Sequence, residues 1–168
     1  MPSTAIEKDR FGVTVDGTAV DRYTLRNARG TTVRLITFGA TVTELRVPDR
    51  DGTLADVVLG FDDLALYERS RTYFGCTVGR VAFRIDEGRF TLDGRPHHLT
   101  INAPPHHLHG GTKGLSKIVW RAEPLETAAG PAVRFSCTSP DGDQGYPGRL
   151  EVAVTYTLTA ADELRIEY

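Results

Sequence analysis

The sequence is poor in the features that mark exported, disulfide-rich or membrane-spanning proteins. Its two cysteines, Cys76 and Cys137, lie far apart and follow no metal-binding spacing, so we expect reduced, buried thiols. No apolar run approaches the ~20 residues that span a bilayer. The opening MPSTAIEKDRFG holds no apolar core of a signal peptide. These absences predict a cytoplasmic protein with no membrane partner.

An excess of charge of either sign is also missing. The chain has 20 lysines and arginines against 22 aspartates and glutamates, which gives a net charge of −2. Because nucleic acids and anionic membranes select basic surfaces, neither is expected as a partner. The chain has 168 residues, of which 40% are apolar. This is enough for one domain with a real core, so we expect residues 1–168 to form a single domain.

Helical periodicity is scarce. Only DDLALYERS, at 62–70, predicts a short helix, with Asp62 or Asp63 as its cap. Apolar and polar residues alternate instead in three segments, as they do in half-buried antiparallel strands; these segments are 133–138, 150–158 and 164–168.

The turn residues agree with a fold made of strands. Asp93-Gly94 supplies the two positive φ angles of a type I′ turn, which predicts a hairpin with Leu92 opposite Arg95. Seventeen glycines and nine prolines at short intervals fit many strands joined by turns. We therefore predict an all-β fold, a β-sandwich.

The last predicted strand ends the chain. Its residues Leu164, Ile166 and Tyr168 are expected to face inward. A strong apolar face at this place predicts that more sheet follows and that the domain is incomplete. Exposed apolar strands invite edge pairing, so we also expect self-association or a complementary chain.

Three of the five histidines fall in NAPPHHLHGGTKG, at 102–114. His107 and His109 would point to the same side of an extended segment. Such a pair can bind zinc, with His97 or His98 as a third ligand, but the segment holds no carboxylate or thiol. The alternative without function is that His109 and the glycines behind it build a turn.

The predicted hairpin also bears on Arg84. If its register continues past Gly88, Arg84 lies opposite Ala103, a few residues before His109. Arg84 and His109 then converge at one rim of the sheet.

A guanidinium beside an imidazole suits an uncharged, polyhydroxylated ligand such as a sugar, because both groups donate to hydroxyls. An aromatic face for stacking is available from Phe83, Tyr146 or Trp120. The alternative for Arg84 is a surface ion pair of little energetic value, with Asp86 or Glu87.

Four segments together resemble the aldose 1-epimerase (galactose mutarotase) family. They stand in family order, cover most of the chain, and read FGATVTELRVPDRDGTLADVVLGFDDLALY (38–67), YFGCTVGRVAFRIDEGRFTLDG (73–94), LHGGTKGLSKIVW (108–120) and SPDGDQGYPGRLEVAVTYTLTAADELRIEY (139–168). The resemblance implies a galactose-mutarotase-like β-sandwich. It also implies interconversion of the α and β anomers of aldohexoses such as glucose or galactose, with no cofactor and no metal.

The resemblance further implies the residues of a site. In the family, the arginine of GRVANRI and the histidine of LHGG contact the sugar, and these positions are Arg84 and His109 here. Phe83 stands where the motif has asparagine, so an apolar ring replaces an amide at a substrate-binding position. This exchange is expected to alter affinity or sugar preference.

The family's general-acid histidine and general-base glutamate lie beyond the position of Tyr168. The chain is therefore expected to be truncated before its catalytic residues and to be inactive or very weak alone. Two alternatives stay open: a non-catalytic carbohydrate-binding protein and a histidine-rich, metal-binding β-domain.

Overall fold

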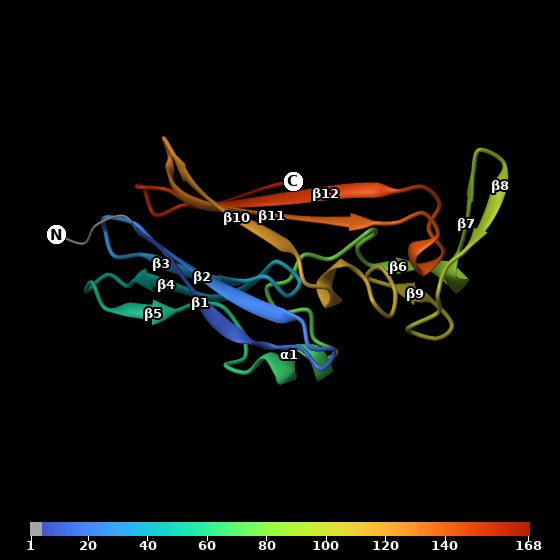
Figure 1. Ribbon diagram of the computed structural model, residues 1–168, viewed down its shortest axis with the longest axis horizontal. Coiled ribbons are helices and arrows are strands. Elements are labelled where there is room, and N and C mark those ends of the chain that lie inside the picture. The colour runs from blue at the N-terminus through green and yellow to red at the C-terminus, as the bar shows by residue number, and fades with distance from the viewer. Residues whose placement is uncertain (1–4) are drawn as a thin grey trace.

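The computed structural model describes residues 5–168, and its body consists of two stacked antiparallel sheets (Figure 1). The first sheet has five strands in sequence order: β1 (Ala5–Val13), β2 (Ala19–Arg26), β3 (Thr32–Ile36), β4 (Thr41–Pro48) and β5 (Leu54–Asp56). The second has four: β10 (Arg121–Thr127), β11 (Gly130–Ser139), β12 (Leu150–Leu158) and β13 (Leu164–Glu167). The predicted all-β sandwich is confirmed. The first four residues, part of the opening segment in which no signal was expected, lie outside the described residues.

Smaller elements gather at one end of the sandwich. Two further two-stranded sheets, drawn at the right of Figure 1, are made of β6 (Arg84–Ile85) with β9 (His107–Leu108) and of the hairpin β7 (Arg89–Leu92) with β8 (Arg95–His98). The β7–β8 turn pairs Leu92 with Arg95, as Asp93-Gly94 predicts. Short 3-10 turns span Asp86–Gly88, Leu115–Lys117 and Asp143–Gly145.

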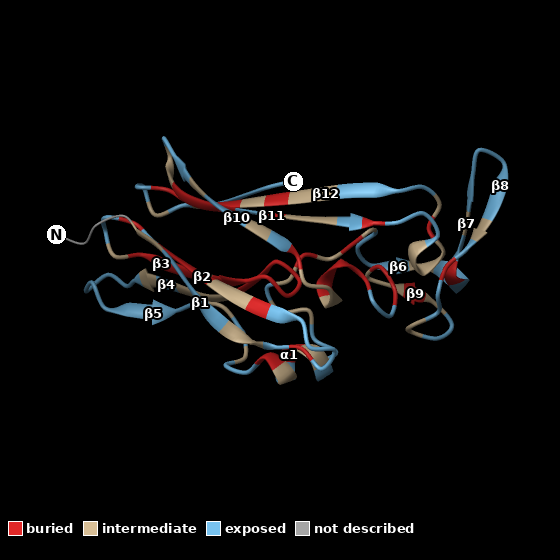
Figure 2. Ribbon diagram, in the orientation of Figure 1, coloured by how far each residue is buried: buried red, intermediate tan, exposed pale blue. Residues whose placement is uncertain are grey.

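The main core lies between the two sheets, where Figure 2 shows the buried segments facing each other. Alternation along the strands sends every second side chain inward. Tyr23 of the first sheet and Phe135 of the second meet edge to face, with ring centroids 6.3 Å apart. Around them pack the aliphatic side chains Leu25, Val33, Leu35, Val133, Val154 and Leu158, all with no exposed surface.

A single helix lies on the other face of the first sheet. This helix, α1 (Leu64–Arg69), begins at Asp63, whose carboxylate accepts the backbone N–H of Ala65 at 2.6 Å and so confirms the predicted cap. Leu64 and Tyr67 of the helix pack on Val20, Ile36 and Phe38. The helix therefore covers part of the outer face of the first sheet.

The edge strand β13 departs from the expected burial. Ile166 lies opposite the buried Tyr156, so the two side chains share a face of the sheet. Ile166 is nevertheless 46% exposed, and Tyr168 is 82% exposed. Ile166 therefore points to the inner face as predicted, but it stays largely exposed because β13 is the outermost strand. Tyr168 follows β13 and is not buried, so the prediction that it packs inward is wrong.

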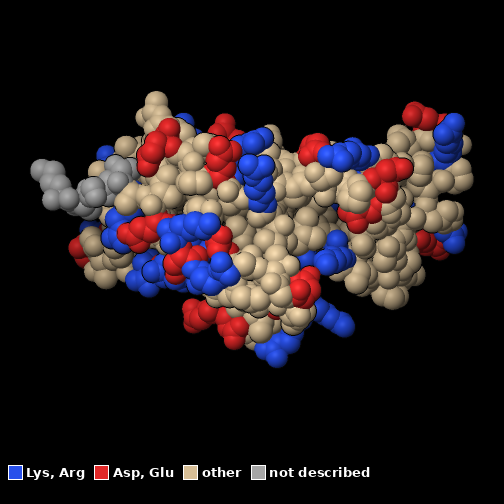
Figure 3. All heavy atoms as spheres, viewed as in Figure 1, with Lys and Arg blue, Asp and Glu red and all other residues tan. Residues whose placement is uncertain are grey.

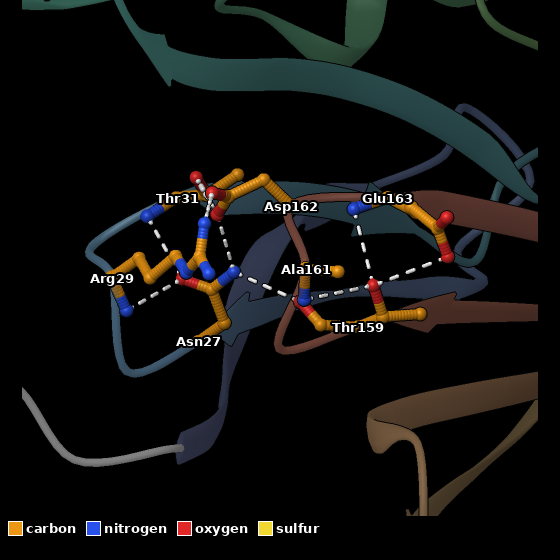
Figure 4. A network of polar contacts seen from close by, with 7 residues as sticks. All are labelled: Asn27, Arg29, Thr31, Thr159, Ala161, Asp162 and Glu163. Atoms are coloured by element: carbon orange, nitrogen blue, oxygen red, sulfur yellow. Dashed lines mark hydrogen bonds and ion pairs between the residues drawn. The ribbon is translucent and has the colours of Figure 1, made fainter.

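At the end of the sandwich away from the β7–β8 hairpin, buried polar groups join the two sheets (Figure 4). Asn27 donates from its amide to Thr159 O at 2.9 Å and to Asp162 Oδ1 at 2.7 Å. Thr31 Oγ1 donates to the same carboxylate oxygen at 2.7 Å, and Arg29 donates to the other at 3.3 Å. These residues, which we call the clasp, tie the β2–β3 turn to the β12–β13 turn.

Charges of both signs intermix over the face seen in Figure 3, as the near-neutral composition predicts. Several are cross-strand pairs on the face of the first sheet that points away from the core, such as Asp9 with Arg22 at 3.0 Å and Arg34 with Glu44 at 2.9 Å. Within residues 5–168, no helix has the length and apolar character needed to cross a membrane.

Candidate functional site

The short β6–β9 pair brings Arg84 and His109 together. Arg84 lies directly opposite Leu108, the residue before His109. The backbone N–H of His109 donates to Phe83 O at 3.0 Å, and the backbone N–H of Phe83 donates to His109 Nδ1, also at 3.0 Å. The guanidinium and the imidazole therefore project from neighbouring positions of one small sheet.

The register that creates this pairing is not the expected one. Arg84 does not lie opposite Ala103, because the β7–β8 ladder stops at Arg89 and His98. The 3-10 turn that follows β6 has Glu87 at φ 45° and Gly88 at φ 61°. On the other side, residues 99–106 form a longer loop. The extra residues on that side move the partner of Arg84 to Leu108.

Glycines allow the segment after His109 to pass very close to another backbone. His109 has φ 50°, followed by Gly110 at φ 86° and Gly111 at φ 97°. A Cβ added to Gly110 would lie 1.5 Å from Gly79 O, so no other residue fits there. The two glycines thus turn the chain immediately after His109. The prediction that His109 and these glycines build a turn is confirmed.

The environment of His109 favours its neutral form. Burial lowers the pKa of the imidazole below its ordinary value, and the positive charge of Arg84 lowers it further. Because Nδ1 accepts the Phe83 N–H, the neutral ring carries its proton on Nε2. Nε2 has no hydrogen-bond partner within residues 5–168. His109 is therefore fixed as a hydrogen-bond donor, with its lone pair already engaged.

Arg84 is exposed and keeps its donors free. Its guanidinium lies 5.7 Å from the centroid of the Phe83 ring, which is 68% exposed. The alternative of a surface ion pair is not realised, because Asp86 contacts His106 at 3.1 Å and Glu87 contacts Arg89 at 3.4 Å. Five N–H donors thus remain available for a ligand.

A groove of about 620 Å³ adjoins these two side chains, within the size range of small-molecule sites. Arg84 lines it, and the ring of Tyr73, another lining residue, packs against His109 with centroids 4.5 Å apart. The other lining residues are Ser70, Arg71, Asn102, Ala103, Pro104, Leu108, Gly111, Thr112 and Lys117. The lining mixes polar and apolar residues and carries no carboxylate.

Two basic residues join the segments around this region, and no local pattern in the sequence indicates either role. Arg80 donates to Ser139 Oγ at 2.8 Å and to Pro140 O at 2.7 Å, which ties the chain before β6 to the end of β11. Lys117 Nζ donates to Tyr67 O at 2.6 Å and Ser70 O at 2.8 Å at the end of α1. The donors of both side chains are thus engaged by protein oxygen atoms, most of them backbone carbonyls.

The alternative of a zinc-binding histidine pair is not supported by the positions of His107 and His109. His107 has no exposed surface, and both its ring nitrogens are engaged, with Thr100 O at 2.7 Å and with Tyr146 Oη at 2.8 Å. The positive φ of His109 breaks the alternation that would align it with His107. Among residues 5–168, no three histidine, cysteine or acidic side chains are grouped so that they could hold a metal ion.

Two of the three aromatic candidates for stacking are also wrong. Trp120 is 2% exposed and donates Nε1–H to Leu115 O at 2.9 Å, while Tyr146 is 5% exposed and binds His107. Phe83 is the only one of the three with a solvent-facing ring.

A second groove, of about 510 Å³, lies between the β1–β2 turn and residues 112–119. Its two carboxylates already have protein partners: Asp16 accepts from Thr14, and Glu68 accepts from the backbone N–H of Val15. The groove beside Arg84 and His109, where donors remain free, is therefore the stronger candidate.

Comparison with known proteins identifies the family of the chain. The family model for aldose 1-epimerase matches residues 21–168. The chain belongs to the aldose 1-epimerase family. It is 48% identical to the galactose mutarotase of Rattus norvegicus over 152 residues, which cover 90% of this chain and 43% of that protein. It is 43% identical to the galactose mutarotase of Sus scrofa over 168 residues, which cover 100% of this chain and 44% of that one.

The fold is that of the family as well. The crystal structure of galactose 1-epimerase from Lactobacillus acidophilus superposes with a TM-score of 0.85 at 27% identity, covering 98% of this chain and 47% of that one. The chain thus spans less than half the length of the aldose 1-epimerase relatives it matches.

Proposed function

We propose that this chain forms the sugar-binding wall of an aldose 1-epimerase that interconverts the α and β anomers of aldohexoses such as glucose or galactose. The observation that carries the proposal is the juxtaposition of Arg84 and His109 beside a groove of about 620 Å³. Both groups donate hydrogen bonds, and a hexose offers hydroxyl and ring oxygens that accept them. Tyr73 and Phe83 add aromatic surface for the apolar face of a sugar ring.

Mutarotation is acid–base chemistry. A base takes the proton of the anomeric hydroxyl while an acid protonates the ring oxygen. The ring opens, the C1–C2 bond rotates, and reclosure gives the other anomer. A positioned acid or base contributes about 10²–10⁴-fold to such a step. His109 suits binding better than proton abstraction, because its Nδ1 lone pair already accepts the Phe83 N–H.

The groups that transfer protons are therefore proposed to lie outside this chain. The groove lining holds no aspartate or glutamate, and the family resemblance implies a catalytic histidine and glutamate beyond the position of Tyr168. We expect the chain alone to bind aldohexoses with little or no acceleration of mutarotation.

Sugar binding and polarimetry test this proposal together. Calorimetric titration with galactose and glucose should show binding, and Arg84→Ala should weaken it by about tenfold or more, since a lost charged donor is worth ~1.5–3 kcal/mol. Arg95→Ala, an exposed arginine at the tip of the β7–β8 hairpin, is the matched control and should leave affinity unchanged. Absence of any sugar binding would contradict the proposal.

The second candidate is a carbohydrate-binding protein without catalytic function, favoured by the carboxylate-free lining. Polarimetry of freshly dissolved α-glucose separates the two when the chain is mixed with a polypeptide that carries the remaining half of the family's sequence. Acceleration in the mixture supports the epimerase, whereas binding without acceleration supports the non-catalytic protein.

We also propose that the chain associates through the edge of its second sheet. Strand β13 has a partner on one side only, and it pairs with residues 155–158 of β12, which leaves residues 150–154 with an open edge. Leu150, Ile166 and Tyr168 expose apolar surface there, which favours strand addition. Sedimentation should show concentration-dependent association that Ile166→Lys abolishes; a monomer at all concentrations would contradict this.

A cytoplasmic location is proposed on the two cysteines. Both are free, and burial raises the pKa of each thiol to about 11, which keeps the thiols protonated and unreactive. Microscopy of a fluorescent fusion of the chain tests this location.

A further inference from the structure

Asn102 makes a two-sided contact with the backbone next to His109. It lies in the loop between β8 and β9 and lines the candidate sugar groove. Its side-chain amide donates to Leu108 O at 2.8 Å, and its Oδ1 accepts the backbone N–H of Leu108 at 2.7 Å. One side chain thus satisfies both backbone groups of a single residue.

The side chain of Asn102 makes the hydrogen bonds to Leu108 that a third strand of the β6–β9 sheet would make. The sheet formed by β6 and β9 has only these two strands, and the hydrogen bond from His109 N–H to Phe83 O fixes which residues bond across it. Because N–H and C=O groups of successive residues point to opposite sides of a strand, those of Leu108 point away from β6. The amide of Asn102, with one donor and one acceptor, takes the place of a neighbouring peptide.

Leu108 is the residue on which the geometry of the site depends. It lies opposite Arg84 and directly precedes His109. Its carbonyl also accepts the backbone N–H of Gly111 at 3.0 Å, which closes the turn that carries the imidazole. A shift of Leu108 would therefore change both the Phe83–His109 hydrogen bonds and the distance from the imidazole to Arg84.

We propose that Asn102 is a positioning residue of the candidate sugar site, which holds Leu108 so that His109 keeps its Nε2–H tautomer beside Arg84. The consequence for sugar rests on the proposed function, whereas the consequence for the imidazole does not. Charged and titratable groups that face His109 are Arg84, across the strand pair, and Tyr73, which packs on the ring. Arg84 lowers the pKa of His109 and Tyr73 packs on its ring, and both interactions depend on the position of the imidazole.

The test measures the tautomer and the pKa of His109 by long-range ¹H–¹⁵N NMR of the histidine side chains. The wild-type chain should show the Nε2–H tautomer and a lowered pKa. Asn102→Leu, which keeps the volume and removes both hydrogen bonds, should give mixed tautomers and raise the pKa towards that of a free imidazole. Its affinity for galactose should fall by roughly tenfold, because the donors no longer converge.

Asn102→Asp keeps the shape and the acceptor for Leu108 N–H but loses the donor to Leu108 O, so it should fold even if Asn102→Leu does not. We expect it to shift the His109 tautomer in the same direction. The chain has one other asparagine, Asn27, which is buried and whose amide also bridges backbone groups. Asn27→Leu and Asn27→Asp should lower thermal stability and leave the His109 signals unchanged.

The outcomes separate this inference from the proposed function. If both Asn102 variants lower stability but leave the tautomer and pKa of His109 as in the wild type, Asn102 is a structural residue and the inference is overturned. If the wild-type chain binds no sugar while the Asn102 variants still shift His109, the positioning role stands and the proposed function fails.

Discussion

The two ends of the sandwich differ in how their polar side chains are hydrogen-bonded. At the clasp, Asn27 and Thr31 are 1% and 0% exposed, and each donates to Asp162, so the buried side chains bind one another inside the protein. At the groove end, Arg84 and His109 are held through one side only: the backbone fixes their positions, and their outward donors have no protein partner among the described residues.

This contrast distinguishes a ligand-binding site from a hydrogen-bond network that only stabilises the fold. Both ends join segments that are distant in sequence, and both contain residues with positive φ. Satisfied networks specify the fold, because an unpaired buried polar group costs about 1–3 kcal/mol. A ligand-binding site instead has hydrogen-bond donors without protein partners, which can bind a ligand. The two ends should therefore respond differently to substitution.

The largest effect is expected at the groove end, from Gly110→Ala. The added Cβ would lie 1.5 Å from Gly79 O, at φ 86°, so two backbone segments must separate. We expect a loss of about 4 kcal/mol in the free energy of unfolding, measured by urea denaturation.

Gly142→Ala is the matched control. Gly142 has φ 79° but no atom within 4 Å of the added Cβ, so it should lose only about 1 kcal/mol. Equal losses for the two variants would mean that backbone conformation alone, and not the close approach, makes Gly110 necessary.

The next effect is expected at the clasp, from Asp162→Ala. The variant removes the acceptor for Asn27, Thr31 and Arg29, and should cost about 2 kcal/mol in unfolding free energy. Asp49→Ala is the control, because Asp49 accepts only from the backbone of its own turn; a smaller loss is expected there. Sugar affinity should be unchanged in both variants, and a loss of affinity on Asp162→Ala would show that the two ends are coupled.

The clasp also predicts how stability depends on acid. The hydrogen bonds from Asn27, and then from Thr31, lower the pKa of the Asp162 carboxyl in the folded protein. A lowered folded-state pKa means that the stabilisation is complete above the ordinary aspartate pKa of about 4 and is lost as the pH falls through the lowered value. Urea denaturation between neutral and strongly acid pH should therefore show a smaller acid loss for Asp162→Ala than for the wild type. Parallel curves would contradict the prediction.

Local patterns predicted the elements of both ends but not their connections. The Asp93-Gly94 hairpin, the Asp63 cap and the strand Leu150–Leu158 follow from turn chemistry, capping and alternation over a few residues. The clasp joins Asn27 to Asp162 across most of the chain, and no short-range pattern indicates such a contact.

The prediction for Arg84 shows a different limit. We expected Ala103 opposite Arg84 by extending the β7–β8 register, but that register ends at Arg89. The 3-10 turn that interrupts it, with Glu87 and Gly88 at positive φ, leaves no mark in the alternation of apolar and polar residues. Asn102 was missed for the same reason, because its role depends on which way the backbone of Leu108 points. The convergence of Arg84 and His109 that this register predicted is nevertheless found, with Leu108 and not Ala103 opposite Arg84.

The smallest effect is expected from Phe83→Asn, at the groove end. Phe83 holds φ 70°, a region that bulky side chains rarely adopt and asparagine tolerates. Relief of about 1 kcal/mol of strain, less about 0.5 kcal/mol for the lost contact with Arg84, should raise the unfolding free energy by about 0.5 kcal/mol. Phe83→Ala removes the ring without supplying an amide and should give no gain. If Phe83→Asn also strengthens galactose binding and Phe83→Ala does not, the new amide contacts the sugar; a loss of stability in Phe83→Asn would instead mean that the exposed ring stabilises this end of the protein.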